Sequence, residues 1–551
     1  MLNALSHAPP PFNEPVLSHA PGTPERAALK AELARLAGTE TEMPLIIGGK
    51  EIRTGKLGAA VMPHAHAHLL GHYHLAGPTE VGAAIDAAVA AQVDWARMSQ
   101  GSRAAIFLKA AELLATKFRP VLNAATMLGQ SKTAHQAEID AACELIDFFR
   151  FNVHFAERIL AEQPISGPGI WNQVESRPLE GFVFAVSPFN FTSIAGNLPT
   201  APAILGNTAV WKPASTAVYS AHFIMQLLME AGLPPGVINL VYGSGAAVGD
   251  LVLDSPHLAG VHFTGSTGVF QGMWRRIGER IDRYRTYPRL VGETGGKDFI
   301  FAHESADRQA LAVAIVRGAF EFQGQKCSAA SRVYLPSTIA DDVRQRVVAM
   351  IAELTVGDVG DFSNFMGAVI DKKAYRDHVG YIEHARGDGS KILAGGTYDD
   401  KVGWFIQPTL IEAVDPKSKS MREEIFGPVL SWYVYDAARV DDALTLCDET
   451  SPYALTGAVF SQDRGFIETA TDRLRHAAGN FYINDKPTGA VVGQQPFGGA
   501  RASGTNEPDP LGVPPNDQGD LRAPDQLALS VLGQRLRGRA PNGGFLATGR
   551  A

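Results

Sequence analysis

Cysteine is scarce in this sequence, with only 3 among 551 residues, at Cys143, Cys327 and Cys447. Cysteines so few and so widely spaced cannot build a disulfide framework, and this usage is typical of a reducing compartment. None of them belongs to a CxxC pair, so a zinc site built on thiolates is not expected.

The sequence also has no long apolar run, no surplus of positive charge and no targeting pattern at its start. No run is long enough to cross a membrane, and the first residues show neither a secretory signal nor an Arg-rich amphipathic stretch. A net charge of -8 and a pI near 6.1 argue against general nucleic-acid binding. We therefore expect a cytoplasmic protein with a small-molecule substrate, and no nucleic acid or membrane among its partners.

What the chain does have is enough length for two or more cores. Of its 551 residues 45% are hydrophobic and 19% are charged, as in globular proteins. From Gly181 short apolar runs alternate with helical patterns, beginning with the run Phe182–Val186. A second series starts near Phe299 and continues to about residue 479. This alternation predicts an α/β fold with doubly wound parallel sheets.

Cys327 has the most informative surroundings of the three cysteines. It lies in a Gly-containing turn after an apolar helical pattern, directly behind Lys326. Backbone amides and a lysine nearby are expected to favour the thiolate, which is the nucleophilic form. Upstream, Glu293 lies in a glycine-rich turn, and a nucleophile with a separate acid suggests covalent catalysis followed by hydrolysis. Taken alone, Cys327 is more easily explained as a small buried hydrophobe.

Two polar residues follow neighbouring predicted strands. Asn190 comes after the strand Phe182–Val186, at the strand end where open α/β sheets place their ligands. Its amide could stabilise an oxyanion, or equally close a turn. Lys212 ends the next strand and could reach ribose hydroxyls or a phosphate, although a surface lysine is usually just solvated.

Glycine-rich turns lead into two helical patterns, at 242–249 and at 263–268. Either turn could present backbone N–H groups to a pyrophosphate at a helix N-terminus. Neither matches G-x-G-x-x-G, and as tight turns they need no ligand. Glu424 stands beside an aromatic residue and a turn, and is also explained as the end of a helix.

Three histidines alternate along a predicted strand, at His64, His66 and His68. Alternation places them on one face, and this spacing can hold a metal ion. No carboxylate or cysteine accompanies them locally, so we interpret the segment as a solvated strand and expect no metal site.

In their order along the chain, these segments resemble the NAD(P)-dependent aldehyde dehydrogenase superfamily from about residue 50 to 505. The resemblance rests on the segments Ser187–Asn190, Trp211–Pro213, Phe263–Ser266, Glu293–Lys297, Gly324–Cys327 and Glu424–Pro428, and on Asn484. Within the superfamily, the chain is similar to the branch that oxidises L-glutamate γ-semialdehyde, formed from Δ1-pyrroline-5-carboxylate, to L-glutamate in proline catabolism. That likeness rests on the segments Glu138–Asn152, Phe189–Pro199 and Gly493–Thr505.

The resemblance implies a role for each matching residue. Cys327 would be the nucleophile, forming first a thiohemiacetal and then a thioester, with Asn190 in the oxyanion hole and Glu293 activating water. The cofactor would be NAD, and its expected contacts are Ser187, Lys212, Gly265, Ser266, Thr267, Gly268, Val269, Glu424 and Phe426. The expected substrate contacts are Ser328, Gly489, Ala490, Phe191, Phe497 and Glu144. Members often have Ser where this chain has Ala490, which would remove one hydroxyl from the carboxylate anchor.

The implied architecture is aldehyde dehydrogenase-like: a Rossmann-like NAD domain, an α/β catalytic domain and a small β-flap for oligomerisation. We place an N-terminal arm at 1–50, the NAD domain at 51–162 and 180–291, and the catalytic domain at 292–479. The flap and the substrate-anchor loop are assigned to 163–179 and 480–505, with a strand near Phe481 in the flap. Residues 506–551 form a tail unlike the family, expected to lack regular structure. A homo-oligomer, dimer or larger, is expected.

Three other interpretations remain open. The enzyme could oxidise another semialdehyde, such as succinate semialdehyde. It could be a binding protein that keeps the fold without the reaction, although the set Cys327, Glu293 and Asn190 is intact. It could be a thiol esterase that uses Cys327 without a nicotinamide. The sequence does not decide between NAD and NADP, although the family favours NAD.

Overall fold

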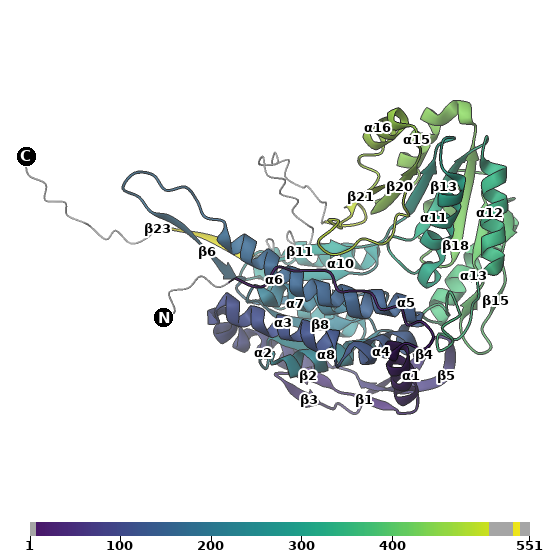
Figure 1. Ribbon diagram of the computed structural model, residues 1–551. Coiled ribbons are helices and arrows are strands. Elements are labelled where there is room, and N and C mark those ends of the chain that lie inside the picture. The colour runs from purple at the N-terminus through teal and green to yellow at the C-terminus, as the bar shows by residue number, and fades with distance from the viewer. Residues whose placement is uncertain (1–6, 506–532, 540–551) are drawn as a thin grey trace, which may run out of the picture.

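Two seven-stranded sheets organise the chain, and each forms the centre of one lobe (Figure 1). The computed structural model describes residues 7–505 and 533–539. The first sheet has the strand order β11-β10-β7-β8-β9-β2-β3, and the second has the order β14-β17-β18-β13-β12-β20-β21. The strands at the centre of each sheet run parallel, joined by helical crossovers. The predicted α/β fold class is confirmed.

The first sheet is formed mostly by the apolar runs that follow Gly181. Strand β7 is buried almost throughout, as a strand covered by helices on both faces requires. Its strands are β2 (Leu45–Ile47), β3 (Lys50–Ile52), β7 (Phe182–Ser187), β8 (Thr208–Pro213), β9 (Ile238–Leu240), β10 (Leu258–Thr264) and β11 (Arg289–Glu293). The helices around it are α2 (Pro78–Arg97), α3 (Gln100–Ala115), α4 (Arg119–Gln130), α6 (Leu145–Ala161), α7 (Thr192–Ile204), α8 (Val218–Ala231), α9 (Asp250–Leu253) and α10 (Thr267–Gly278).

The second sheet follows directly after the first, and helices cover it as well. Its strands are β12 (Asp298–Ala302), β13 (Ala330–Pro336), β14 (Lys391–Ala394), β17 (Thr409–Glu412), β18 (Val429–Tyr435), β20 (Thr456–Phe460) and β21 (Asn480–Ile483). Its helices are α11 (Arg308–Phe320), α12 (Ala340–Glu353), α13 (Lys372–Gly387), α15 (Val440–Glu449) and α16 (Arg464–Arg473). Short paired strands complete this part of the chain: β15 (Tyr398–Asp399) with β16 (Phe405–Ile406), and β19 (Tyr453–Ala454) with β22 (Ala500–Arg501).

The N-terminal region is part of the first lobe, so the predicted arm boundary at residue 50 is too late. Helix α1 (Pro24–Ala37) buries Leu29, Leu33 and Leu36 in the main core. Strand β2 then pairs with β9 inside the first sheet, although it lies within 1–50. On its other side β2 pairs antiparallel with β3, so this apolar strand is buried between two neighbours in the sheet.

A small sheet beside α1 contains the histidine-rich segment, with β5 (Ala65–His74) between β1 (Thr41–Met43) and β4 (Leu57–Met62). The ring nitrogens of His66 and His68 hydrogen-bond to the carbonyls of Asp400 and Ala37. His64 precedes the strand and is buried at 4% exposure, with Nδ1 3.2 Å from Ser131 Oγ. The interpretation as a solvated strand is therefore wrong for His64, which packs between segments.

The helical stretch that begins at Ala134 contains a π-helix. The segment η1 (Glu138–Glu144) lies between α5 (Ala134–Ala137) and α6, and most of it is buried. A π-helical turn inside an α-helix often marks a functional site, because the extra residue redirects the side chains that follow it. None of the helices among the described residues is long and apolar enough to cross a membrane.

The flap was predicted to include a strand near Phe481, but a different strand completes it. Strand β6 (Asn172–Pro178) pairs antiparallel with β23 (Gly533–Arg539), and the two project from the first lobe (Figure 1). Phe481, predicted for the flap, lies in β21 instead, because that strand pairs in parallel with β20 at the edge of the second sheet. The tail therefore contains a strand at 533–539, and the remainder of 506–551 lies outside the described residues.

Arg332 is a buried cation at the start of β13. Its guanidinium donates to the carbonyl of Lys297 at 2.8 Å, to the carbonyl of Cys447 at 3.0 Å and to the hydroxyl of Tyr334 at 3.2 Å. The side chain therefore ties the beginnings of β12 and β13 to α15.

We expect Arg332→Ala to lower the free energy of unfolding by at least about 2 kcal/mol, since each buried carbonyl left without a donor costs about 1–3 kcal/mol. Urea unfolding measures the change. Arg464→Ala is the control, because that side chain is 93% exposed and should leave stability unchanged. Equal stability of the two variants would contradict this role.

Candidate active site

The two sheets meet where the chain passes directly from β11 to β12. Glu293 is the last residue of β11, and Asp298 is the first of β12. The carboxyl ends of the parallel strands of the first sheet therefore face the amino ends of β12 and β13. Open α/β sheets bind ligands beyond the carboxyl ends of their strands, so this junction is the candidate site.

Cys327 lies at this junction, just ahead of β13, and is 9% exposed. The turn before it contains three residues with left-handed backbone: Phe322 (φ 52°), Gln323 (φ 56°) and Gly324 (φ 64°). A Cβ at Gly324 would lie 2.3 Å from the carbonyl oxygen of Gly427. Glycine is therefore required there, and the tight turn determines where Cys327 is placed.

The electrostatics around Cys327 differ from the prediction. Burial raises the pKa of the thiol well above its usual range, and the negative charges of Asp298, Glu293 and Glu424 raise it further. The neighbouring Lys326 does not offset them, because its Nζ lies 3.4 Å from Glu321 Oε2. The expectation that a lysine stabilises the thiolate is therefore wrong, since the Lys326 ammonium pairs with a carboxylate instead.

Residues 499–504, near the end of the described range 7–505, hold the side chain of Glu293. Its Oε2 accepts a hydrogen bond from the backbone N–H of Gly499 at 3.0 Å. A Cβ at Gly504 would approach Glu293 Oε1 to 2.6 Å, so a larger residue there would displace the carboxylate. Thr294 continues the contact, donating from its backbone N–H to the Ser503 carbonyl at 2.7 Å. A backbone N–H thus helps to orient the carboxylate.

Two buried ionisable residues beside Glu293 were not assigned roles from the sequence. Asp298 is 1% exposed, and its Oδ2 has no hydrogen-bond partner among the described residues. Burial raises the pKa of Asp298 well above its usual value. Burial likewise lowers the pKa of Lys297 to about 7, and its Nζ donates to Ser331 Oγ at 2.6 Å. Side chains immediately after a glycine pair are a signal that could have identified both.

Glu424 reaches the same junction from the loop before β18. Its Oε1 accepts from the backbone N–H of Gly296 at 2.9 Å, and burial raises its pKa to about 7. Phe426 follows with a left-handed backbone (φ 56°), and its ring meets Phe189 edge-on at 5.7 Å. The structure thus brings the predicted Glu424 and Phe426 next to the loop that carries Asn190.

Asn190 lies in that loop, between β7 and α7, and is 3% exposed. Ser187 closes β7, and its hydroxyl accepts from the indole N–H of Trp211 at 2.9 Å. Lys212 lies opposite Val186 on the neighbouring strand, buried, and its Nζ donates to the carbonyl of Pro213 at 3.3 Å. Burial lowers the pKa of Lys212. The predicted residues therefore line adjacent strand ends, as expected.

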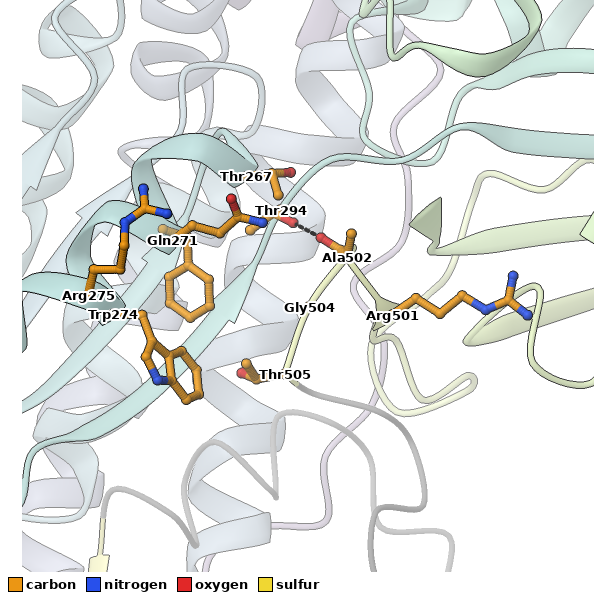
Figure 2. Close-up of a pocket in the computed structure, with 10 residues that line it drawn as sticks. Thr267, Gln271, Trp274, Arg275, Thr294, Arg501, Ala502, Gly504 and Thr505 are labelled. Carbon is orange, nitrogen blue, oxygen red and sulfur yellow. Dashed lines mark hydrogen bonds between the residues drawn. The ribbon is translucent and has the colours of Figure 1, made fainter. Parts of the chain in front are cut away.

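The residues 265–269 form the turn from β10 into α10. Ser266 precedes the helix, and a Cβ at Gly268 would meet nothing within 4 Å. The backbone N–H of Gly265 donates to the Glu293 carbonyl at 3.2 Å, and that of Val269 donates to the Ser266 carbonyl at 3.1 Å. A cavity of about 330 Å³ opens on another side of α10. Figure 2 shows Gln271, Trp274 and Arg275 on α10 near Thr294, whose hydroxyl donates to the Ala502 carbonyl at 2.6 Å.

The predicted carboxylate anchor comes together beside the nucleophile. Ser328 donates from its hydroxyl to Thr488 Oγ1 at 3.1 Å. Thr488 is followed by Gly489, whose backbone is left-handed (φ 117°), and by Ala490. Thr488 is 4% exposed and was missed from the sequence, although it directly precedes the Gly-Ala pair. The side chain at 490 provides no hydroxyl, but Thr488 places one next to Ser328.

A second buried pair supports the aromatic wall of the site. Lys132 is fully buried, with its Nζ 2.6 Å from Asp140 Oδ2 and 4.3 Å from the centre of the Phe191 ring. Asp140 accepts from the backbone N–H of Ser193 at 3.0 Å, and Ser193 donates to Glu144 Oε2 at 2.9 Å. The structure thus joins the predicted Phe191 and Glu144 through Lys132 and Asp140, which the sequence analysis did not identify.

Phe497, the other predicted aromatic contact, reaches the site with the segment that binds Glu293. The adjoining Gly498 donates to Asn480 Oδ1 at 3.0 Å, and Gly499 donates to Glu293. Phe497 itself is half-buried. Every predicted site residue therefore lies at the junction of the two sheets or on a segment bonded to it.

The arrangement combines a buried thiol, a backbone-held carboxylate and polar groups suited to a dinucleotide. The N-terminus of α10 suits a pyrophosphate, the Lys212 ammonium can donate to ribose hydroxyls, and the Glu424 carboxylate can accept from them. The donor set therefore fits NAD. A thiol and a carboxylate in one water-poor site can form and then hydrolyse an acyl intermediate.

Comparison with known proteins agrees with this chemistry. A model of the aldehyde dehydrogenase family matches residues 53–511. The chain is 49% identical over 508 residues to the mitochondrial Δ1-pyrroline-5-carboxylate dehydrogenase of Dictyostelium discoideum, across 92% of this chain and 91% of the relative. It is 48% identical over 497 residues to the mitochondrial protein of that name from Homo sapiens, across 90% of this chain and 88% of the relative.

Solved structures give the same result. The crystal structure of the Δ-pyrroline-5-carboxylate dehydrogenase from Mycobacterium tuberculosis bound with NAD has a TM-score of 0.90 and 49% identity, covering 99% of both chains. The 1-pyrroline-5-carboxylate dehydrogenase from Thermus with bound NAD has a TM-score of 0.87 and 33% identity, covering 97% of this chain and 100% of that one.

We expect Glu293→Gln to speed alkylation of Cys327 in the free protein, because removing a nearby negative charge lowers the thiol pKa and exposes more thiolate. Each unit by which the pKa falls gives about a tenfold faster reaction. Iodoacetamide labelling at pH 8, followed by mass spectrometry, measures the rate at each cysteine. Cys143 and Cys447 are buried internal controls. A slower reaction would instead show that Glu293 takes the thiol proton.

Proposed function

The chain belongs to the aldehyde dehydrogenase family, and on that premise we propose that it oxidises L-glutamate γ-semialdehyde to L-glutamate with NAD. The semialdehyde is the open form of Δ1-pyrroline-5-carboxylate, the compound in the relatives' names. The observation that carries the proposal is 49% identity across 92% of the chain to such a dehydrogenase. The reaction belongs to the breakdown of proline to glutamate.

The residues that would hold NAD come from both sheets. The turn at 265–269 would receive the pyrophosphate, and Lys212 and Glu424 would bind ribose hydroxyls. Ser187 already accepts a hydrogen bond from Trp211, so its hydroxyl hydrogen remains available to a ligand. When bound, NAD supplies the acceptor for the hydride that leaves the aldehyde carbon.

Cys327 would begin the reaction. Its thiolate adds to the aldehyde carbon, which forms a carbon–sulfur bond and places negative charge on the former carbonyl oxygen. The Asn190 amide and the Cys327 backbone N–H would donate to that oxygen. Because burial and acidic neighbours raise the thiol pKa, the thiolate is a minor form before substrate arrives. In the adduct, the negative charge of the thiolate has moved to the former carbonyl oxygen, where these donors stabilise it.

Glu293 would complete the turnover. After oxidation, the acyl group remains on Cys327 Sγ as a thioester. Glu293, held through Gly499, takes a proton from water, the hydroxide adds to the acyl carbon, and the carbon–sulfur bond breaks. The products are the free thiolate and the γ-carboxylic acid of glutamate, which releases its proton to solvent to become the carboxylate.

Substrate selection would depend on groups around Ser328. The Ser328 and Thr488 hydroxyls and the backbone at Gly489 and Ala490 suit an α-carboxylate. Phe191 and Phe497 would flank the aliphatic chain. Glu144, which already accepts from Ser193, would balance the α-ammonium.

We further propose a division of labour among segments and an oligomeric state. Residues 51–162 and 180–291 would bind the cofactor, and residues 292–479 would carry the chemistry. The flap exposes large apolar side chains at its tip, with Ile165 at 93% and Trp171 at 75% exposure. Exposed apolar surface of this kind supports assembly with further copies of the chain. The scarcity of cysteine supports a cytoplasmic location, whereas several relatives are named mitochondrial.

We expect purified protein to form NADH with Δ1-pyrroline-5-carboxylate in preference to succinate semialdehyde. Cys327→Ala should reduce this rate by at least about 10³-fold, since it removes the covalent nucleophile. Absorbance at 340 nm measures the product. Cys447→Ala, in a buried core cluster of the second lobe, is the matched control. Faster turnover of succinate semialdehyde would keep the mechanism and overturn the substrate.

We expect Ala490→Ser to lower KM for Δ1-pyrroline-5-carboxylate by up to about tenfold, because a third hydroxyl, beside those of Ser328 and Thr488, could donate to the α-carboxylate. Initial-rate kinetics at saturating NAD measure it. Ala438→Ser, on the exposed surface of the second lobe, is the control. An unchanged or higher KM would show that Thr488 already fills the role of that hydroxyl.

A further inference from the structure

The first described residues of the chain run along α6 and the π-helix as an extended strap (Figure 1). We define this leading segment as residues 8–19. Its backbone N–H groups donate to carboxylates of the underlying helices: Ala8 to Glu157 at 2.8 Å, and Leu17 to Glu138 at 2.9 Å. The segment therefore gains a fixed path without forming regular structure of its own.

Buried ion pairs hold the leading segment in place. Glu14 lies 2.6 Å from a guanidinium nitrogen of Arg119 and 2.7 Å from one of Arg150. Arg119 pairs in turn with Glu138, which is fully buried. Although burial alone would raise the pKa of Glu138, hydrogen bonds from His19 and Arg119 lower it to about 2. Charge-assisted bonds among buried groups make this path stiff.

Asn13 lies where the leading segment crosses the anchor loop, which we define as residues 488–495. Its Nδ2 donates to Asp147 Oδ2 at 2.8 Å and to the carbonyl of Val492 at 2.8 Å. Its Oδ1 accepts from Gln494 Nε2 at 2.8 Å. The Asn13 side chain thus links helix α6 to the anchor loop through its amide nitrogen and its amide oxygen.

The anchor loop is attached at its other end to the nucleophile's neighbour. Thr488 accepts from Ser328, as described above, and Val491 donates its backbone N–H to Gln495 Oε1 at 2.8 Å. Gly493 passes so close to Phe151 that a Cβ there would approach the ring to 2.1 Å. Between Thr488 and Val492, the loop carries Gly489 and Ala490. The placement of their backbone groups therefore depends on both attachments.

We propose that Asn13 is a positioning residue for the substrate, because it holds the anchor loop in the shape that binds the α-carboxylate. The inference rests on the proposed function. An anchor made of backbone N–H groups has no rotamer that can adjust, so the loop itself must be held within a fraction of an ångström. Asn13 supplies that constraint, although it lies far from Cys327 in the sequence.

The test is Asn13→Ala in the full chain, assayed with Δ1-pyrroline-5-carboxylate and, separately, with p-nitrophenyl acetate. We expect KM for the first substrate to rise about tenfold, with kcat and KM for NAD within about twofold. Ester hydrolysis at Cys327 should be unchanged, since that substrate has no α-carboxylate. Val16→Ala, in the same segment and 50% exposed, is the matched control.

Gln494→Ala removes the bond to Asn13 from the exposed side of the loop, and serves if Asn13→Ala does not fold. It should raise the same KM, and the double variant should show less than the product of the two effects. An unchanged KM, or a loss shared equally by NAD, the ester and thermal stability, overturns the proposal. Parent protein that fails to oxidise Δ1-pyrroline-5-carboxylate overturns the proposed function instead, and this inference with it.

Discussion

The short passage from Glu293 to Asp298 joins the two sheets, and the arrangement of the site depends on it. Two consecutive glycines make the passage possible. A Cβ at Gly295 would lie 2.3 Å from Glu424 Oε2, and one at Gly296 would lie 2.2 Å from the carbonyl oxygen of Cys327. Because no side chain separates these groups, the thiol and its acidic neighbours converge in one small volume.

Bringing these acidic groups together is electrostatically unfavourable, and protonation of carboxylates limits the repulsion between them. Carboxylates so close together and so deeply buried cannot all be ionised. Burial raises the pKa of Asp298 well above its usual range and that of Glu424 to about 7, so at neutral pH part of the Glu424 population is protonated. In the proposed mechanism, Glu293, which accepts from a backbone N–H, is the carboxylate that would act on water.

The sequence predicted the fold class, because it is expressed locally: alternating apolar runs indicate parallel sheets. Local patterns also singled out Cys327, Glu293, Asn190 and Lys212, which lie at strand ends or in turns. Relations between distant segments were not predictable. Lys326 precedes Cys327 and was expected to stabilise its thiolate, yet its ammonium pairs with Glu321. Thr488 becomes part of the site only through its hydrogen bond with Ser328. The flap was misassigned because pairing of β6 with β23 joins strands far apart in the chain.

The leading segment also bears on how the protein is made. Asn13 leaves the ribosome long before Val492 and Gln494, and the bonds between them close almost the whole described chain. Domains acquire structure from the N-terminus during synthesis, but this contact has no partner until residues 492 and 494 have been made. A nascent or prematurely terminated chain can therefore form much of its first sheet while its substrate anchor is still unassembled.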